Sequence, residues 1–141
     1  MTNKMTERVT SSFESQSMMK TLRARIHKVL KGKVSIEVPL LPSMLQQQGY
    51  AHAGLTFSIG DSAAGYSALT LMPENQEVMT AEIKINLLAP ADGELLRAEG
   101  KVVKNGKRLV IVTSEIYALK NRKKKLIALM QGTMIPVQMK T

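Results

Sequence analysis

The sequence contains no cysteine and no tryptophan, and aromatic residues make up only 4% of it. The absence of cysteine excludes disulfide bonds, thiolate nucleophiles and zinc sites built from thiolates. It also fits the reducing environment of the cytoplasm, where we expect the protein to act. The scarcity of aromatic rings argues against a nucleic-acid partner, because such proteins often stack bases on rings between basic residues.

Long apolar runs are absent as well. No segment approaches the run of about 18 apolar residues that a membrane-spanning helix needs. Residues 1–10 are polar and lack the apolar core of a secretory signal. We therefore expect no membrane partner. The 141 residues suit one domain, which we place at residues 11–141, after a flexible N-terminus over residues 1–10.

Positive charge is abundant, with a formal net charge of +9 at pH 7. Such a balance favours an anionic partner, which can be a nucleic acid, an anionic lipid or a small ligand that carries phosphate. Charge alone does not choose among these partners. A solvated basic surface that keeps the protein soluble explains the same charge.

The hydrophobic pattern predicts two helices of different kinds. In residues 11–31, Met18, Leu22, Ile26 and Val29 recur at helical spacing, and Gly32 follows as a plausible helix stop. Residues 33–38 alternate as a half-buried strand does, and residues 40–53 form a loop. Residues 54–71 are rich in small side chains and carry one formal charge, so we expect a buried helix.

The rest of the chain reads as four consecutive strands, at residues 77–88, 94–104, 108–118 and 126–137. Asn105-Gly106 is a strong hairpin signal between the second and third of them, and a basic turn over residues 119–125 precedes the last. Consecutive strands joined by tight turns form an antiparallel sheet, whose apolar face needs a cover. The buried helix supplies that cover, which makes the fold class α+β.

Candidate chemistry gathers where the buried helix begins. Asp61 is a lone carboxylate in an apolar helix, and burying such a group is costly unless it is paired or used. The first N–H groups of a helix have no partner within it, so the Ala53 N–H can polarise a carbonyl. Gln46 and His52 precede this helix start, although each also has an ordinary structural explanation as a loop or helix-entry residue.

Spacing limits how these groups can cooperate. Asp61 follows Ala53 by eight residues, which is roughly 12 Å along a helix axis. One carbonyl group therefore cannot contact both residues of one chain. A shared site requires Asp61 from one subunit and Ala53 from another, as in a two-fold packing of antiparallel helices. We therefore expect active sites at a homodimer interface.

The segment from Gln46 to Ala63, with His52-Ala53-Gly54 and Asp61 in it, resembles the His-Gly-Gly helix-entry motif of the PaaI-like hotdog thioesterases. Residues 80–90, 99–108 and 128–133 resemble that family's later strands. The resemblance implies a hotdog fold with a long central helix, here with an extra N-terminal helix. It also implies dimers that often pair into tetramers, and hydrolysis of acyl-CoA thioesters without a metal or cofactor.

The resemblance also implies residue roles. Asp61 would act as general base or nucleophile, the Ala53 N–H would polarise the thioester carbonyl, Gln46 would orient the nucleophile or water, and His52 and Gly54 would support the helix entry. Ala53 departs from the family's glycine. It keeps the N–H, but it would be strained at a positive φ. We expect the CoA phosphates to meet residues of the two basic turns: Lys104, Gly106, Lys107, Arg108 and Arg122.

Other functions fit the same sequence. A non-catalytic acyl-CoA sensor would keep the pocket and the basic residues. A protein that binds nucleic acid or anionic membranes would owe its affinity to the net charge of +9 and would depend steeply on salt. A hotdog dehydratase is a weaker possibility, because His52 lies in the wrong place for its histidine–acid pair.

Overall fold

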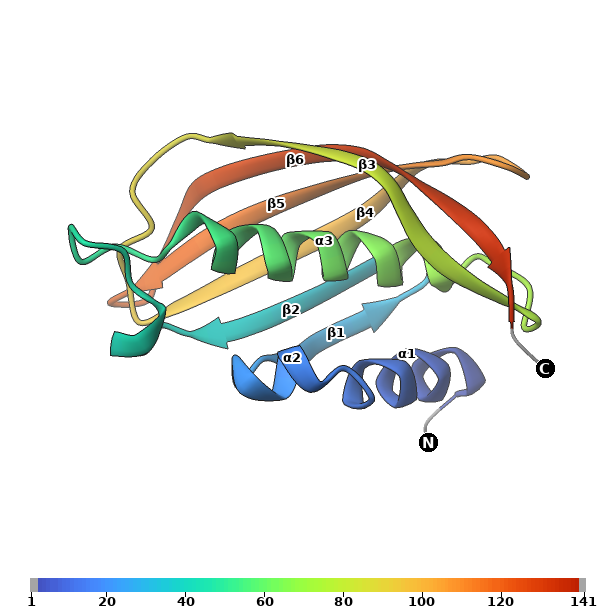
Figure 1. Cartoon of the computed structure of the whole chain (residues 1–141), viewed down its shortest axis with the longest axis horizontal. Coiled ribbons are helices and arrows are strands. Elements are labelled where there is room, and N and C mark those ends of the chain that lie inside the picture. The colour runs from blue at the N-terminus through green and yellow to red at the C-terminus, as the bar shows by residue number, and fades with distance from the viewer. Residues whose placement is uncertain (1–2, 140–141) are drawn as a thin grey trace.

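A computed structural model describes residues 3–139 and shows one antiparallel sheet wrapped around a long helix (Figure 1). The helices are α1 (Lys4–Glu14), α2 (Ser17–Thr21), the short 3₁₀ helix η1 (Pro42–Met44) and the central α3 (Ala53–Leu69). The strands are β1 (Arg25–Leu30), β2 (Lys33–Pro39), β3 (Gln76–Leu87), β4 (Leu95–Asn105), β5 (Val110–Lys120) and β6 (Lys123–Gln138). Their order in the sheet is β1-β2-β4-β5-β6-β3, which confirms the predicted hotdog architecture.

Small residues let α3 lie directly against the sheet. A methyl group at Gly100 of β4 would overlap the backbone carbonyl of Ala63 in α3, so glycine is needed for this close approach. The buried Ser67 adds a polar link. Its hydroxyl donates to the Ala63 carbonyl at 2.7 Å and accepts from the Val34 N–H of β2 at 2.9 Å. The buried central helix predicted from the sequence is confirmed, and its position on the sheet is fixed.

The prediction of one helix over residues 11–31 is wrong. α1 begins at Lys4, because Asn3 accepts a hydrogen bond from the Thr6 N–H at 2.7 Å and caps it. α1 also buries Val9 and Phe13. Residues 4–10 are therefore helical rather than the flexible N-terminus that we expected, while residues 1–2 lie outside the described part. Gly32 has φ of +75° and belongs to the β1–β2 hairpin turn instead of ending a helix.

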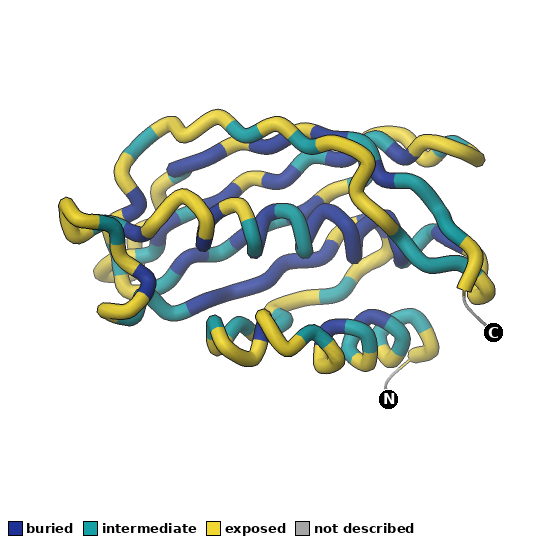
Figure 2. Tube along the Cα trace, viewed as in Figure 1, coloured by how far each residue is buried: buried dark blue, intermediate teal, exposed yellow. Residues whose placement is uncertain are grey.

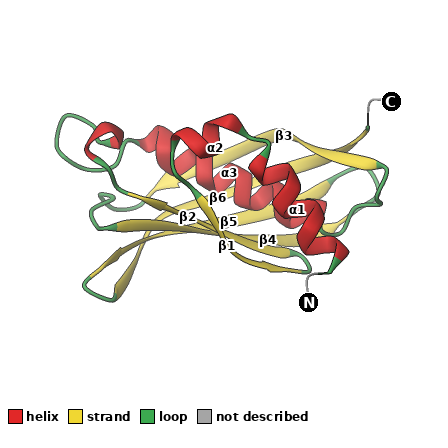
Figure 3. Cartoon of the chain, turned by 90° about the horizontal axis from the view of Figure 1, so that it is seen from below, coloured by secondary structure: helices red, strands yellow, loops and turns green. Residues whose placement is uncertain are grey.

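α1 lies beside α3 and holds its C-terminal end (Figure 3). The Arg8 guanidinium donates hydrogen bonds to the carbonyls of Leu69 at 3.3 Å, Met72 at 2.8 Å and Pro73 at 2.9 Å, and also to that of Gln76. The last carbonyls of a helix have no partner within the helix. One side chain thus satisfies the carbonyls at the end of α3 and in the segment that follows it.

The four later strands are confirmed, with ends shifted by a few residues. The Asn105-Gly106 hairpin is present, but its loop is longer than two residues: Asn105 pairs with Val110, and the Gly106 N–H donates to the Leu109 carbonyl at 3.0 Å. The β5–β6 turn is the tight one. Asn121 and Arg122 occupy positive φ angles of 51° and 64°, as a two-residue turn of type I′ requires.

β3 is an edge strand that pairs only with β6 and is largely exposed, as Figure 2 shows. The exposed apolar side chains at this edge include Met79, Leu87 and Leu88. A long edge strand with exposed apolar groups offers unpaired N–H and C=O groups to a second chain. Within residues 3–139, no helix has the length and apolar character needed to cross a membrane.

Candidate active site

The N-terminus of α3 is open, and His52 organises it. His52 is the N-cap residue: its Nδ1 accepts from the Gly54 N–H at 2.8 Å, and its own N–H donates to the Met44 carbonyl at 3.0 Å. The Ala53 N–H has no hydrogen-bond partner among residues 3–139. His52 therefore orients the helix entry and occupies one donor, while the donor expected to polarise a carbonyl is left available.

Alanine fits the position where the family motif has glycine. Ala53 is the first residue of α3 and is not among the non-glycine residues with a positive φ, which are Arg23, Asn121 and Arg122 in the described chain. A residue with an ordinary helical φ accepts a Cβ without strain. The departure from glycine therefore costs no backbone energy here.

Gln46 stabilises the loop before α3. Its Oε1 accepts from the Gln48 N–H at 2.5 Å and from the Tyr50 N–H at 3.3 Å, and its own N–H donates to the Tyr50 carbonyl at 2.8 Å. These bonds keep the side chain on its own loop. Gln46 nevertheless contributes to the wall of the hollow in front of the helix start.

That hollow, which we call the helix-start hollow, has a volume of about 570 Å³. Its lining brings together three of the predicted site residues, Gln46, His52 and Ala53, while Gly54 is not part of the wall. The opposite wall comes from the segment after β3, including Leu88 and Pro90. The volume falls within the range of about 300–1,000 Å³ that is typical of ligand sites.

Asp61 lies in a different, smaller hollow of about 280 Å³. Its Oδ1 accepts a hydrogen bond from the Thr80 hydroxyl of β3 at 2.7 Å, and the carboxylate has no ion-pair partner among the described residues. Tyr66 lines the same hollow, and its hydroxyl is held by Gln16 at 2.6 Å and by Ser12 at 3.1 Å. The Asp61 carboxylate is thus oriented by a hydroxyl rather than neutralised by a cation.

No residue lines both hollows. The carboxylate and the open helix end therefore lie in separate hollows of one chain, and the helix geometry separates Ala53 from Asp61 by roughly 12 Å along the axis. The sequence did not predict the contact from Thr80, because this contact joins β3 to α3 and leaves no local pattern in the sequence.

The five residues expected to bind CoA do not form one cluster. Gly106 and Lys107 line a hollow with Met72 and Pro136, at the C-terminal end of α3. Arg122 lies in the β5–β6 turn, at the other end of the sheet. Successive turns of an antiparallel meander alternate between the two ends of its strands, so Lys104, Gly106, Lys107 and Arg108 cannot lie beside Arg122 in one chain.

A hollow of about 560 Å³, which we call the lysine hollow, lies next to the β5–β6 turn. Lysines dominate its lining: Lys120, Lys123, Lys124 and Lys125. It shares Tyr50 and Pro90 with the helix-start hollow, so the two hollows lie next to each other. Arg122 adds a further positive charge in the same turn, although it does not line the hollow.

Comparisons with known proteins agree with this fold. The chain aligns over 96% of its length with a thioesterase family protein from Silicibacter pomeroyi, at 38% identity, 99% coverage of that chain and a TM-score of 0.93. Two further solved structures are each 21% identical. Escherichia coli PaaI has a TM-score of 0.84 with 94% and 93% of the chains covered, and a Bacillus halodurans protein crystallised with CoA has a TM-score of 0.76 with 99% and 97% covered.

The family model described as "Thioesterase superfamily" matches residues 48–125, which include the helix start, Asp61 and the lysine hollow's turn. This match covers more than half of the chain. The chain therefore belongs to the thioesterase superfamily, with a PaaI-like hotdog fold.

Proposed function

We propose that the protein hydrolyses an acyl-CoA thioester to a free acid and CoA, in active sites shared between two subunits. The observation that carries the proposal is that α3 holds two groups suited to thioester hydrolysis: the Ala53 N–H, an unused backbone donor, and Asp61, a carboxylate oriented by a hydroxyl. Membership of the thioesterase superfamily supplies the reaction class. The acyl-CoA substrate, the residue roles and the assembly are the proposed parts.

The reaction follows from where charge develops. The thioester oxygen accepts a hydrogen bond from the Ala53 N–H, at the positive end of the α3 dipole, so negative charge on that oxygen is stabilised. Asp61 then takes a proton from water while the water oxygen bonds to the carbonyl carbon. The carbon–sulfur bond breaks and the CoA thiolate takes up the proton. If Asp61 attacks directly, a mixed anhydride forms first and water hydrolyses it.

A homodimer would complete each site. Two α3 helices packed antiparallel about a two-fold axis bring Ala53 of each chain towards Asp61 of the other. The exposed edge of β3, with Met79 and Leu87, supports such an interface, because it offers both unpaired backbone groups and apolar surface. We expect two active sites per dimer and propose that dimers pair into tetramers.

The lysine hollow would take the phosphates of CoA. It lies next to the helix-start hollow, and positive side chains attract and hold phosphate groups. The CoA-bound Bacillus halodurans structure supports CoA as a ligand of this fold. We therefore propose that Arg122, together with Lys120 and Lys123, binds the CoA phosphates in the site of its own chain. The other residues expected to bind CoA lie at the opposite end of the sheet in that chain: Lys104, Gly106, Lys107 and Arg108.

The test is CoA release from a panel of short, long and aryl acyl-CoAs, followed with a thiol-reactive dye. The chain has no cysteine and adds no background. We expect Asp61→Asn to lose at least about a hundredfold in kcat, a typical loss for an acid–base group, and the exposed Glu74→Gln to act as wild type. CoA binding without turnover on any substrate would instead indicate a sensing module.

A further inference from the structure

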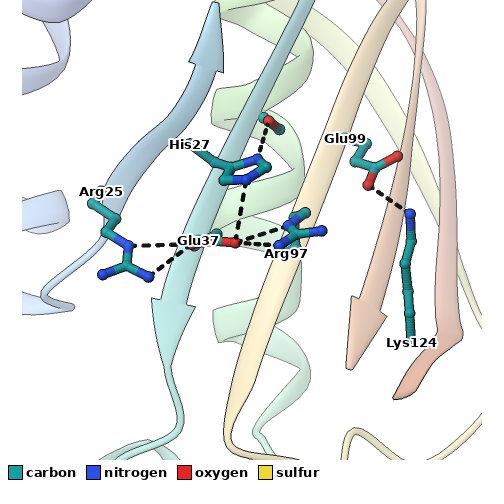
Figure 4. A network of polar contacts seen from close by, with 7 residues as sticks. Arg25, His27, Glu37, Arg97, Glu99 and Lys124 are labelled. Atoms are coloured by element: carbon teal, nitrogen blue, oxygen red, sulfur yellow. Dashed lines mark hydrogen bonds and ion pairs between the residues drawn. The ribbon is translucent and has the colours of Figure 1, made fainter. Parts of the chain in front are cut away.

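The sheet face that points away from α3 carries a hollow of about 450 Å³, which we call the outer-face hollow. It lies over β1, β2, β4 and β5, and Figure 4 shows several of its side chains. Its basic lining residues are His27, Lys28, Lys33, Arg97, Lys101 and Lys124, against two acidic ones, Glu99 and Glu115. It shares no residue with the helix-start hollow or with the hollow around Asp61.

A β-bulge in β1 concentrates charge on this face. Ile26 pairs with Ile36 and Lys28 pairs with Ser35, so His27 is the extra residue between them. At the bulge, His27 and Lys28 of β1 are both opposite Ser35 of β2. Both side chains therefore point to the outer face. The His27 Nδ1 lies 3.1 Å from the Ser35 hydroxyl oxygen. A regular strand would have sent one of these two basic side chains to the core side.

Directly opposed like charges also lie in this hollow. Lys33 of β2 is the cross-strand partner of Lys101 in β4, and Glu99 is the partner of Glu115 in β5. Like charges in such positions destabilise a sheet. The acidic pair is compensated, because Lys124 contacts Glu99 at 2.9 Å and the Tyr117 hydroxyl donates to Glu115 at 2.8 Å.

Tyr117 donates to Glu115 as a protonated hydroxyl. Its burial and the hydrogen bond to Glu115 raise the pKa of Tyr117 to about 12, so the hydroxyl keeps its proton at neutral pH. The basic pair has no such compensation: within residues 3–139, Lys28, Lys33 and Lys101 have no ion-pair partner. Three cations therefore surround one end of the hollow without a counter-charge.

The buried carboxylate nearby does not neutralise them. Glu37 is bound by Arg25 at 2.9 Å and by Arg97 at 2.7 Å, and the His27 Nε2 lies 3.9 Å from its Oε2 (Figure 4). Glu37 is thus already paired with two guanidinium groups. Its effect is to fix Arg97 and the imidazole of His27 at the wall of the hollow, so this wall needs little ordering when a ligand binds.

We propose that the outer-face hollow binds a small organic phosphate through a diphosphate or triphosphate group. The opposed Lys33 and Lys101 would share the phosphate oxygens, with Lys28 beside them, so ligand binding would remove the repulsion between the two lysines. The exposed Leu30 at the rim offers an apolar contact for the organic part. The hollow's volume suits a small molecule of this size.

The experiment measures binding of inorganic pyrophosphate and of ADP by calorimetry, at constant ionic strength, and the melting temperature with and without each ligand. The test variant is Lys33→Gln/Lys101→Gln. One control, Lys107→Gln/Arg108→Gln, removes the same charge from the β4–β5 hairpin. A second control, Lys120→Gln/Lys123→Gln, removes it from the lysine hollow, which shares Lys124 with the outer-face hollow.

We expect both ligands to bind and to raise the melting temperature of the wild type. The test variant should bind each at least about tenfold more weakly at the outer-face site, a loss of 1.4 kcal/mol, and Lys107→Gln/Arg108→Gln should bind as the wild type does. Lys120→Gln/Lys123→Gln should lose only the binding that belongs to the CoA site and should keep the binding that the test variant loses. Without ligand, the test variant should melt no lower than the wild type, because it lacks the lysine repulsion. Tighter binding of ADP than of pyrophosphate would assign part of the affinity to the organic group; equal binding would assign it to phosphate alone.

Three results would overturn the proposal. The first is that neither ligand binds saturably. The second is that the lysine-hollow control loses binding while Lys33→Gln/Lys101→Gln retains it, which would move the ligand to the CoA site. The third is that sulfate at equal ionic strength raises the melting temperature as much as pyrophosphate does, because this would show a general anion effect.

Discussion

The two ends of α3 differ in whether their free backbone groups have hydrogen-bond partners. At the C-terminal end, Arg8 donates to the carbonyls of Leu69 and Met72, and the Thr70 hydroxyl donates to the Ser67 carbonyl at 2.7 Å. At the N-terminal end, His52 occupies one donor, and the Ala53 N–H has no partner in the described chain. Figure 2 shows the same contrast in burial, because α3 begins with exposed residues and its second half is buried.

This difference distinguishes groups that stabilise the fold from a group that is available for catalysis. A polar group with all its partners stabilises the fold, and an unpartnered donor at a helix N-terminus is available to a ligand. Satisfied groups are therefore expected to affect stability when they are changed. The open donor is expected to affect turnover. Each prediction below changes one group of either kind.

The largest effect on turnover should come from Ala53→Pro. Proline lacks an N–H, but it is well tolerated at the first position of a helix, and the extended His52 before it has φ −62° and ψ 139°, which suit a residue that precedes proline. The fold should survive while the donor is lost. We expect kcat to fall by about 10²–10³-fold, as when one oxyanion donor is removed.

Ala53→Gly is the matched control, because it keeps the N–H and should stay within a few-fold of wild type. Circular dichroism and the melting temperature would verify that the proline variant is folded. A folded Ala53→Pro enzyme with full activity would contradict the role of this backbone donor.

Arg8→Gln should have the largest effect on stability. It leaves carbonyls at the end of α3 without donors, and one unsatisfied buried group costs about 1–3 kcal/mol. Because these carbonyls are only partly buried, we expect the free energy of unfolding in urea to fall by about 1–3 kcal/mol, with kcat of the folded enzyme nearly unchanged. Lys4→Gln, on the exposed side of the same helix, should be neutral. An equal loss in both variants would show that Arg8 acts only through net charge.

The sequence predicted the architecture well except at the N-terminus, where a helix was expected over residues 11–31. The β-bulge in β1 explains why this prediction failed. In a regular strand, Ile26 and Val29 would lie on opposite faces. The extra residue His27 puts both on the core side, so their spacing of three imitates a helix. Gly32 then resembled a helix stop, although it serves a hairpin turn. The pairing of β1 with β2 across the sheet determines the structure of this segment, and the local periodicity of the sequence carries no information about that pairing.

The candidate site was predictable where it is local. Gln46, His52 and Ala53 line one hollow because they lie within eight residues of each other around a helix entry. The residues expected to bind CoA do not lie together in one chain, since the two basic turns lie at opposite ends of the sheet. The alternation of turns in an antiparallel sheet would have revealed this. Thr80 was not predictable, because its contact with Asp61 depends on how β3 passes α3.

Thr80→Val tests the orientation of Asp61 at nearly constant side-chain volume. The variant removes the hydroxyl that donates to the Asp61 carboxylate at 2.7 Å, so the carboxylate loses the contact that orients it. We expect kcat to fall roughly tenfold or more, with stability little changed, since Thr80 is exposed. Thr80→Ser should recover most of the rate. A valine variant with wild-type kcat would show that the hydroxyl does not position the carboxylate.

The smallest effect concerns Glu37, a satisfied group far from either end of α3. Burial raises its pKa, but hydrogen bonds from Arg25 and Arg97 outweigh this and hold the pKa of Glu37 below the ordinary value of 4.5. A carboxyl with a lowered pKa in the folded state stabilises the protein above its unfolded pKa, and this stabilisation is lost as the pH falls below about 4.5. Urea unfolding at a series of pH values from neutral to acidic should therefore show wild-type stability falling more steeply below that pH than the stability of Glu37→Gln. Identical slopes would mean that the ion pairs to Glu37 do not stabilise the charged form. Turnover at neutral pH should be unaffected in either case, because neither Glu37 nor its two arginine partners line the helix-start hollow or the hollow around Asp61.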